Sequence, residues 1–272
     1  MLNKHSFDNP LLTNDQLVQS ISQRCGLSAK LEQQLLQHGC ELIQSAGIVL
    51  SLPQVAMASA QVLLWRFFHV CSLTEFSLRD VAMGCLFLAS KVEESPRKIK
   101  DIINVFDYVI KKQRQHHHQQ SAITPLEPFS QMFYDLKNGV TIAELQILRH
   151  LSFNVQVQLP YGLLVNYLQC LRLTSHSRVP QMAWNYLNDG LRTCIYVCYQ
   201  PTTIACAVIF LAARQGQVKL PTKPAWWVVF GASLPDLYHI SGHLLSLYAQ
   251  PPPPGLPLTV EELLEYRNTL PS

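Results

Sequence analysis

The chain carries few charged residues for its length. Of 272 residues only 14% are charged, and the formal net charge at pH 7 is +3. Proteins that bind the phosphates of nucleic acid usually have a basic stripe or a strongly basic domain. Since the net charge here is only +3, we expect no direct nucleic-acid binding. One helical segment is flanked by cations, for which a solvated helix face is the simpler interpretation. These cations are Arg97, Lys98, Lys100, Lys111, Lys112 and Arg114.

The sequence also lacks a long hydrophobic run. The longest one, residues 204–213, is about half of the roughly 20 residues that a membrane-spanning helix needs. Near the N-terminus Lys4 is followed by polar residues, without the continuous apolar stretch of a secretory signal. We therefore expect no membrane segment, and we interpret residues 204–213 as a buried central helix.

Metal-ligand patterns are scarce. None of the 8 cysteines forms a Cys-x-x-Cys pair. Cys85, Cys194, Cys198 and Cys206 lie in apolar helical runs, where free cysteine behaves as a small hydrophobe, and this favours a reducing intracellular compartment. The adjacent histidines at 116–118 lie in a polar Gln-rich tract that offers no fixed coordination geometry. The sequence predicts neither a metal site nor a cofactor.

Catalytic motifs are missing as well. The chain has no Gly-rich phosphate-binding loop and no nucleophile within a recognisable catalytic motif. Its acidic residues are few and scattered, so no carboxylate pair suggests itself. We expect a protein that is not an enzyme.

Strand patterns are absent too, and helical patterns take their place. No segment sustains the alternation of polar and apolar residues between turns that is typical of strands, so the predicted fold class is all-α. The helix that covers residues 78–92 is apolar or small on nearly every face and should be surrounded by others. Helices are expected at residues 31–52, 53–68, 78–92, 99–110, 134–151, 163–171, 182–198, 203–214, 226–230 and 237–248.

The chain contains the same pattern twice, which indicates a duplicated helical module. Phe-Leu-Ala-Ser-Lys at residues 87–91 recurs as Phe-Leu-Ala-Ala-Arg at residues 210–214. A second repeated group keeps one constant spacing. It is Pro53, Gln54, Ala56, Val70 and Cys71, repeated as Pro180, Gln181, Ala183, Val197 and Cys198. Two tandem modules of five helices, each with its own core, are therefore expected.

The expected organisation has four parts. They are an N-terminal extension (residues 1–30), a first module (31–153) with a His/Gln-rich surface insertion at 111–130, a second module (160–248), and a Pro-rich C-terminal tail (249–272). Residues 154–160 are interpreted as an extended linker and 251–254 as an extended spacer. In the tail, Thr259 and Glu262 have the spacing of a capping box, which predicts a short helix.

A family resemblance rests on two groups of residues in the first module. Ala-Ser-Lys-Val-Glu-Glu at residues 89–94 follows the buried helix, and Glu144, Leu145, Leu148 and Phe153 follow later. Together they resemble the cyclin box, and the resemblance covers roughly residues 31–248. Within the cyclin family the chain resembles cyclin L most closely. The stretches that carry this finer resemblance are residues 39–44, 52–58, 97–106, 183–189 and 200–206.

The resemblance implies a regulatory role. Cyclins activate a cyclin-dependent protein serine/threonine kinase by docking on its regulatory helix, whose glutamate pairs with the active-site lysine. Resemblance to cyclin L further implies a kinase of the PITSLRE type, splicing factors as possible partners, a role in RNA polymerase II transcription and pre-mRNA splicing, and a nuclear location.

The residues that contact the kinase in cyclins match Lys91 and Glu144 here. Lys91 ends an apolar helix, where an ammonium can reach partner carbonyls, and Glu144 can pair with cations or backbone amides. We expect both side chains to be exposed in the free chain. The alternative for Lys91 is that it only satisfies the dipole of its own helix, with help from Glu94. Arg214 at the same place in the second repeat supports that alternative.

Further residues complete the predicted kinase-binding set. Val92, Leu148 and Phe153 match apolar interface positions of cyclins, and an aromatic anchor beside charges is a common hot spot. The alternative is that Leu148 and Phe153 are core residues. The full predicted set is Lys91, Val92, Glu94, Glu144, Leu148 and Phe153.

Two departures from the family are visible. The Met-Arg-Ala-Ile-Leu patch that recruits substrates in some cell-cycle cyclins is replaced here by residues 34–38, Gln-Leu-Leu-Gln-His. The chain ends at Ser272 without the Arg/Ser-rich tail of many L-type cyclins.

Two other functions stay open. A general transcription factor of the IIB type shares the doubled fold but grips DNA, which makes its binding steeply salt dependent. A cyclin-fold scaffold could also bind a kinase without activating it.

Overall fold

The computed structural model describes residues 9–12, 19–117, 124–127, 130–249 and 255–269. In these ranges every regular element is a helix, apart from one isolated bridge between Thr222 and Ala225. The all-α prediction is confirmed. None of the helices in the described ranges is long and apolar enough to cross a membrane.

The chain forms two compact units. The first unit comprises Thr13–Gln156 and Pro252–Ser272, and the second comprises Met1–Leu12 and Val157–Pro251. The C-terminal residues thus group with the first unit, where the sequence suggested a separate tail.

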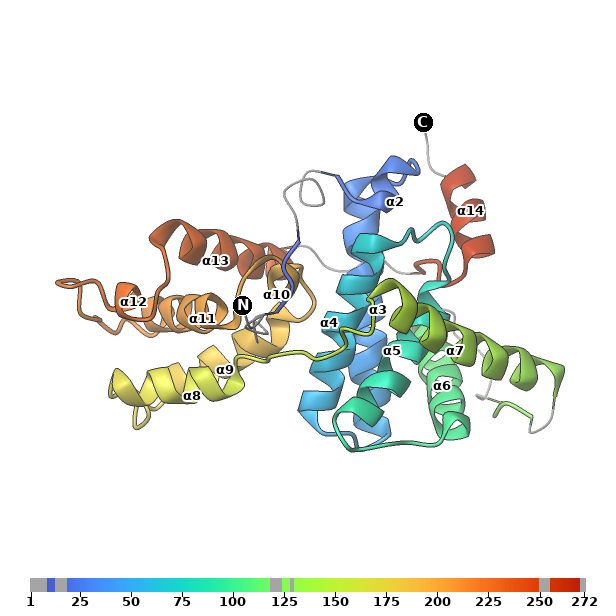
Figure 1. Cartoon of the computed structure of the whole chain (residues 1–272), viewed down its shortest axis with the longest axis horizontal. Helices are drawn as coiled ribbons and strands as arrows, with labels where there is room; N and C mark the ends of the chain where they lie inside the picture. The colour runs from blue at the N-terminus through green and yellow to red at the C-terminus, as the bar shows by residue number, and fades with distance from the viewer. Residues whose placement is uncertain (1–8, 13–18, 118–123, 128–129, 250–254, 270–272) are drawn as a thin grey trace, which may run out of the picture. The chain divides into compact units, whose positions relative to one another are not determined.

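The first unit is built around α5 (Leu78–Val92), the helix predicted to be enclosed. It packs against α3, α4, α6 and α7 (Figure 1). Ser77 precedes it, and its hydroxyl caps the helix by accepting the Asp80 N–H, at 3.4 Å. The other helices of this unit are α2 (Ile21–Arg24), α3 (Ala29–Val49), α4 (Gln54–Val70), α6 (Ile99–His117), α7 (Gln131–His150) and α14 (Val260–Thr269).

The second unit is built around α11 (Pro201–Gln215), which carries the repeated Phe-Leu-Ala pattern. It packs against α8, α9 and α13. α11 thus has the same central place in its unit that α5 has in the first, as expected of a duplicated module. The remaining helices are α8 (Tyr161–Cys170), α9 (Val179–Gly190), α10 (Ile195–Cys198), α12 (Trp226–Val229) and α13 (Leu234–Ala249).

The single helix predicted at residues 182–198 is wrong, because the chain forms α9 and α10 with a break between them. A Cβ atom on Gly190 would lie 2.6 Å from Cδ1 of Ile195. The missing side chain lets Ile195 fold back onto α9. Thr193 supports the turn by donating its hydroxyl to the Gly190 carbonyl, at 2.7 Å.

Helix α6 also differs from its prediction, since it extends to His117 instead of ending at Ile110. No glycine or proline interrupts residues 99–117, and Lys111 pairs with Asp107 one turn earlier, at 2.7 Å. The predicted insertion therefore begins inside a helix. Residues 118–123 and 128–129 of that insertion, which include His118, lie outside the described residues.

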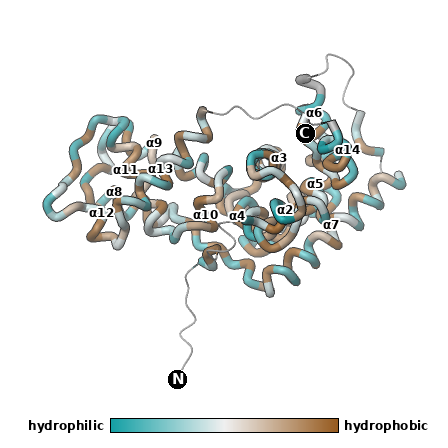
Figure 2. The backbone as a smooth tube through the Cα atoms, turned by 90° about the horizontal axis from the view of Figure 1, so that it is seen from above, coloured by the Kyte–Doolittle hydropathy of each residue, from teal (hydrophilic) through white to brown (hydrophobic). Residues whose placement is uncertain are grey.

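The surface helix α7 shows how sequence pattern and packing agree. Leu136, Val140, Ala143 and Ile147 are buried, and most of the positions between them are polar, with Ile142 and Leu145 as exposed apolar exceptions. In Figure 2 the tube of α7 alternates accordingly between hydrophobic and hydrophilic stretches. One face of α7 lies on α5, and this contact positions the site described next.

Candidate functional site

Lys91 and Glu144 form an ion pair between the last turn of α5 and the middle of α7. The Lys91 side chain is 41% exposed, but that of Glu144 is only 16% exposed. The expectation that both side chains are exposed is therefore wrong for Glu144, which lies in the contact between the two helices. The structure brings the two predicted residues together as direct partners.

Gly84 explains why the two helices approach so closely. It precedes Lys91 by two helical turns and therefore lies on the same face of α5. A Cβ atom on Gly84 would lie 3.0 Å from Cβ of Ala143 and 3.2 Å from the backbone nitrogen of Glu144. The lack of a side chain at Gly84 therefore sets the position of the α7 backbone that carries Glu144.

A second neighbour of Lys91 was not predicted. Its ammonium lies 4.1 Å from the centroid of the Phe87 ring, one turn earlier on α5. The guanidinium of Arg214 lies over the Phe210 ring in the same way, at 4.6 Å. The repeat of Phe87 and Lys91 as Phe210 and Arg214 was the sequence signal for this contact.

The end of α5 is tightly organised around the lysine. Glu93 is the C-cap residue and accepts a hydrogen bond from the Ser59 hydroxyl, at 2.7 Å. Glu94 is exposed, has a left-handed backbone with φ of 51°, and donates its N–H to the Lys91 carbonyl, at 3.3 Å. Val92 is half-buried. The predicted residues 91–94 thus form one compact helix end.

Apolar side chains are exposed on and beyond α7. Phe153 is 70% exposed, which excludes its interpretation as a core residue, and its N–H donates to the Leu148 carbonyl, at 2.8 Å. Leu148 is half-buried. Ile142 and Leu145 are also exposed, although they were not predicted as site residues. Leu145 stands in the Glu-Leu-x-x-Leu pattern, so that pattern was the available signal.

We call Lys91, Val92, Glu144, Leu148 and Phe153 the α5–α7 surface. It combines an ammonium and a carboxylate with a half-buried leucine and a solvent-exposed aromatic ring. Such a mixture of charged and aromatic groups suits recognition of another protein. Among the described side chains, no three of His, Cys, Asp or Glu are grouped so that they could hold a metal ion.

Arg97 departs from the expected solvated face. Its Nε donates to the Leu50 carbonyl at 3.0 Å, and one terminal nitrogen donates to the Ser51 carbonyl at 2.8 Å. These carbonyls follow the C-terminus of α3, which an arginine can satisfy. Arg97 therefore ties the loop after α5 to α3 and supports the helix end that carries Lys91.

Comparison with known proteins gives the context of this surface. The family described as "Cyclin, N-terminal domain" matches residues 15–156. Cyclin-L2 of Mus musculus is 43% identical over 245 residues, which is 90% of this chain and 46% of the relative. Cyclin-L1 of Homo sapiens is 44% identical over 248 residues, which is 91% of this chain and 46% of the relative. The chain thus spans about half the length of these relatives.

Two solved structures share the fold. One is a chain of the yeast RNA Pol II CTD kinase CTDK-1 complex, with a TM-score of 0.68, 18% identity, and coverage of 97% of this chain and 84% of that one. The other is a chain of the CAK complex of Chaetomium thermophilum bound to ATP-gamma-S, with a TM-score of 0.53, 16% identity, and coverage of 81% and 63%.

Proposed function

The chain belongs to the cyclin family, and from this premise we propose that it is the activating, non-catalytic subunit of a cyclin-dependent protein serine/threonine kinase. The observation that carries the proposal is the pairing of Lys91 with Glu144 on the α5–α7 surface. Both residues match kinase-contacting positions of cyclins, and an exposed aromatic ring, Phe153, follows α7.

The geometry suits a helix of the kinase. The ammonium of Lys91 can donate three hydrogen bonds, so its bond to Glu144 leaves donors for carbonyls at the end of a partner helix. The apolar residues Phe153 and Leu148 supply area that is removed from water on docking. By holding the regulatory helix inward, the cyclin completes the lysine–glutamate pair that orients ATP in the kinase.

The kinase partner is proposed from similarity. The 43–44% identity with Cyclin-L2 and Cyclin-L1 supports a kinase of the PITSLRE type, a role in RNA polymerase II transcription and pre-mRNA processing, and a nuclear location. Splicing factors are possible further partners on the same ground. This level of specificity rests on analogy with the relatives.

A pull-down from nuclear extract tests the proposal. The native chain is compared with Lys91→Glu and with Lys30→Glu, which makes the same charge change at an exposed lysine in the first turn of α3. We expect the native chain and Lys30→Glu to retain an active kinase. Lys91→Glu should retain at least about tenfold less, a loss of about 1.4 kcal/mol or more. Mass spectrometry identifies the kinase, and an activity assay on the eluates shows whether it is active.

A double charge reversal separates docking from internal pairing. Lys91→Glu combined with Glu144→Lys restores an ion pair between α5 and α7 but presents the charges in the opposite order. We expect the double variant to fold and still fail to bind the kinase. If it binds as well as the native chain, the pair is structural and the proposed interface is wrong. A captured kinase without activity would instead identify a scaffold.

A further inference from the structure

The C-terminal segment, residues 255–269, lies against the first unit in the manner of a bound peptide. The Leu258 carbonyl accepts hydrogen bonds from the Arg79 backbone N–H at 3.0 Å and from the Ser77 hydroxyl at 3.2 Å. The side chains of Leu256, Leu258 and Leu263 are buried. Two leucines that precede α14 and a third on α14 itself thus anchor this segment.

One carboxylate completes the anchoring. Oε1 of Glu262 accepts from a terminal nitrogen of Arg114 on α6, at 2.8 Å, and Oε2 accepts from the Leu258 N–H, at 2.8 Å. Thr259 directly precedes α14, and its hydroxyl accepts the Glu262 N–H at 3.2 Å, which confirms the predicted cap. Burial raises the pKa of Glu262, but the hydrogen bond from Leu258 and the charge of Arg114 outweigh burial, so the pKa is lowered overall.

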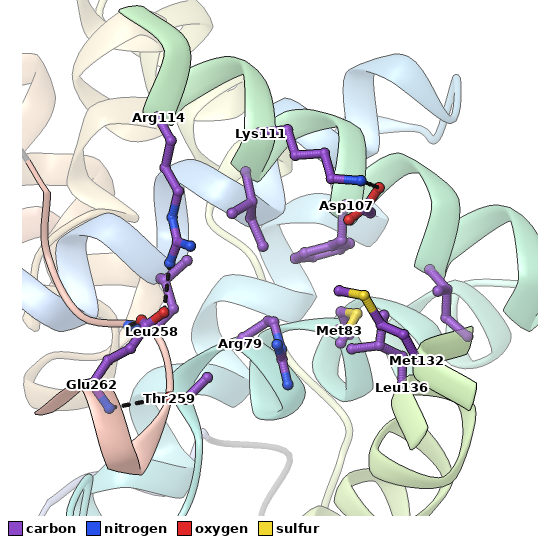
Figure 3. Close-up of a pocket in the computed structure, with 13 residues that line it drawn as sticks. Arg79, Met83, Asp107, Lys111, Arg114, Met132, Leu136, Leu258, Thr259 and Glu262 are labelled. Carbon is purple, nitrogen blue, oxygen red and sulfur yellow. Dashed lines mark hydrogen bonds and ion pairs between the residues drawn. The ribbon is translucent and has the colours of Figure 1, made fainter. Parts of the chain in front are cut away.

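A pocket of about 130 Å³ lies between the segment and helices α5, α6 and α7 (Figure 3). Two of the three cations that line the pocket have carboxylate partners on their own helices. Arg79 pairs with Asp80 on α5, and Lys111 pairs with Asp107 on α6. The third cation, Arg114, pairs with the carboxylate of Glu262 in the C-terminal segment. The apolar lining consists of Met83, Ile103, Phe106, Ile110, Met132, Leu136 and Leu258.

We propose that this groove is a docking site for a linear acidic–apolar segment of a partner protein, and that the chain's own C-terminal segment occupies it when the partner is absent. The chemistry of the resident segment defines the motif. It is Leu-x-Leu in non-helical backbone, followed by a carboxylate four residues after the second leucine. Apolar contacts, one backbone-directed anchor and one ion pair are typical of peptide recognition.

The unfilled volume explains how a partner can displace the resident segment. Leu258 and Thr259 line the pocket together with apolar residues of α5, α6 and α7, and about 130 Å³ beside them stays open. A partner with a bulkier apolar side chain at the place of Thr259 gains contacts that the resident lacks. The resident segment is tethered at an effective concentration of about millimolar, so a partner must exceed it by such contacts or by local concentration.

A labelled synthetic peptide of residues 255–269 tests the site by fluorescence anisotropy. It is titrated into the full native chain and into the full chain with Leu258→Asp and Glu262→Arg, which frees the groove. We expect the freed groove to bind the peptide at least ten times more tightly than the native chain does. Equal binding to both chains, or no binding to a folded chain with the freed groove, overturns the proposal.

A charge exchange gives a second, independent test. Arg114→Glu repels the chain's own Glu262 and should abolish binding of the native peptide, whereas a peptide with Glu262→Arg should bind it. Lys112→Glu, the same charge change at an exposed neighbour on α6, is the control and should change nothing. If light scattering shows that two copies of the native chain exchange their C-terminal segments as a dimer, the groove serves self-association and the proposal is wrong.

Discussion

Lys91 and Arg214 occupy the same place in the two repeats, but their surroundings differ in one respect. Each cation lies over the aromatic ring one turn earlier, so this contact belongs to the duplicated helix itself. Lys91 has a carboxylate partner in Glu144, whereas Arg214 donates to the Tyr238 hydroxyl, at 3.4 Å. The carboxylate is therefore specific to the first unit, which favours a role beyond the electrostatics of a helix end.

Gly84 provides a prediction at the residue scale. Gly84→Val should lower the free energy of unfolding by about 1–3 kcal/mol, because the added atoms force α7 away from α5. It should also weaken kinase capture, since Glu144 moves with α7. Urea denaturation and the pull-down measure the two effects.

The matched control is Gly162→Val on α8, where an added Cβ meets no atom within 4 Å. This variant should keep the native stability or exceed it slightly, since glycine is unfavourable inside a helix. Equal stability of Gly84→Val and the native chain would show that the close approach of α5 and α7 does not depend on Gly84.

At the scale of elements, the repeat predicted the order of helices better than their continuity. Gly190 of α9 corresponds to Leu63 of α4 in the repeat, and Leu63 is fully buried within a continuous helix. The glycine allows the chain to fold back onto itself, so the second unit has two helices where the first has one. A local apolar pattern continues across such a break and therefore does not reveal it.

Arg97 provides a prediction for the junction between elements. Arg97→Ala should lower the free energy of unfolding by about 1–2 kcal/mol, because it leaves the Leu50 and Ser51 carbonyls without their charged donor. Arg97→Lys should recover only part of this loss, since an ammonium lacks the fork that reaches both carbonyls. Chemical denaturation measures both variants. Lys98→Ala, at an exposed neighbour, should have no effect, and full recovery by Arg97→Lys would contradict the capping role.

At the scale of the whole molecule, three histidines make stability depend on pH. Burial lowers the pKa of His38, His69 and His243 from 6.5. Neighbouring groups also shift the pKa values of these histidines. The charge of Glu41 raises the pKa of His38, and that of Arg114 lowers it. The pKa of His69 is raised by its hydrogen bond to the Trp65 carbonyl and by the charge of Glu32. The charge of His239 lowers the pKa of His243.

The sign of the effect follows from the lowered pKa values. Below about pH 6.5 the unfolded chain binds more protons than the folded chain, so stability is complete above that pH and is lost as the pH falls. Thermal melts should therefore show a decreasing melting temperature from pH 7.5 to pH 5. His69→Gln, whose amide can still donate to the Trp65 carbonyl, should reduce this pH dependence. A melting temperature that does not change over this range would contradict the assignment.

The fold could be predicted largely from the sequence because helices are recorded in local patterns. The helix at residues 78–92 has the predicted bounds. Its lack of a polar face predicted that other helices surround it, as they do. The repeat and the Ala-Ser-Lys-Val-Glu-Glu stretch likewise predicted the cyclin family, which the family match confirms. The predicted kinase contacts stay a prediction.

The sequence by itself thus determined most of the helices, the duplication and the family, since each depends on residues that are near one another in the chain or repeat in order. Only the tertiary structure decided that Lys91 pairs with Glu144, 53 residues away, and that Glu262 reaches Arg114 across 148 residues. It also decided that Ser77 holds the Leu258 carbonyl across 181 residues. Such contacts depend on how helices pack, through the absent side chain of Gly84 or the shape of a groove, and no local pattern records that packing.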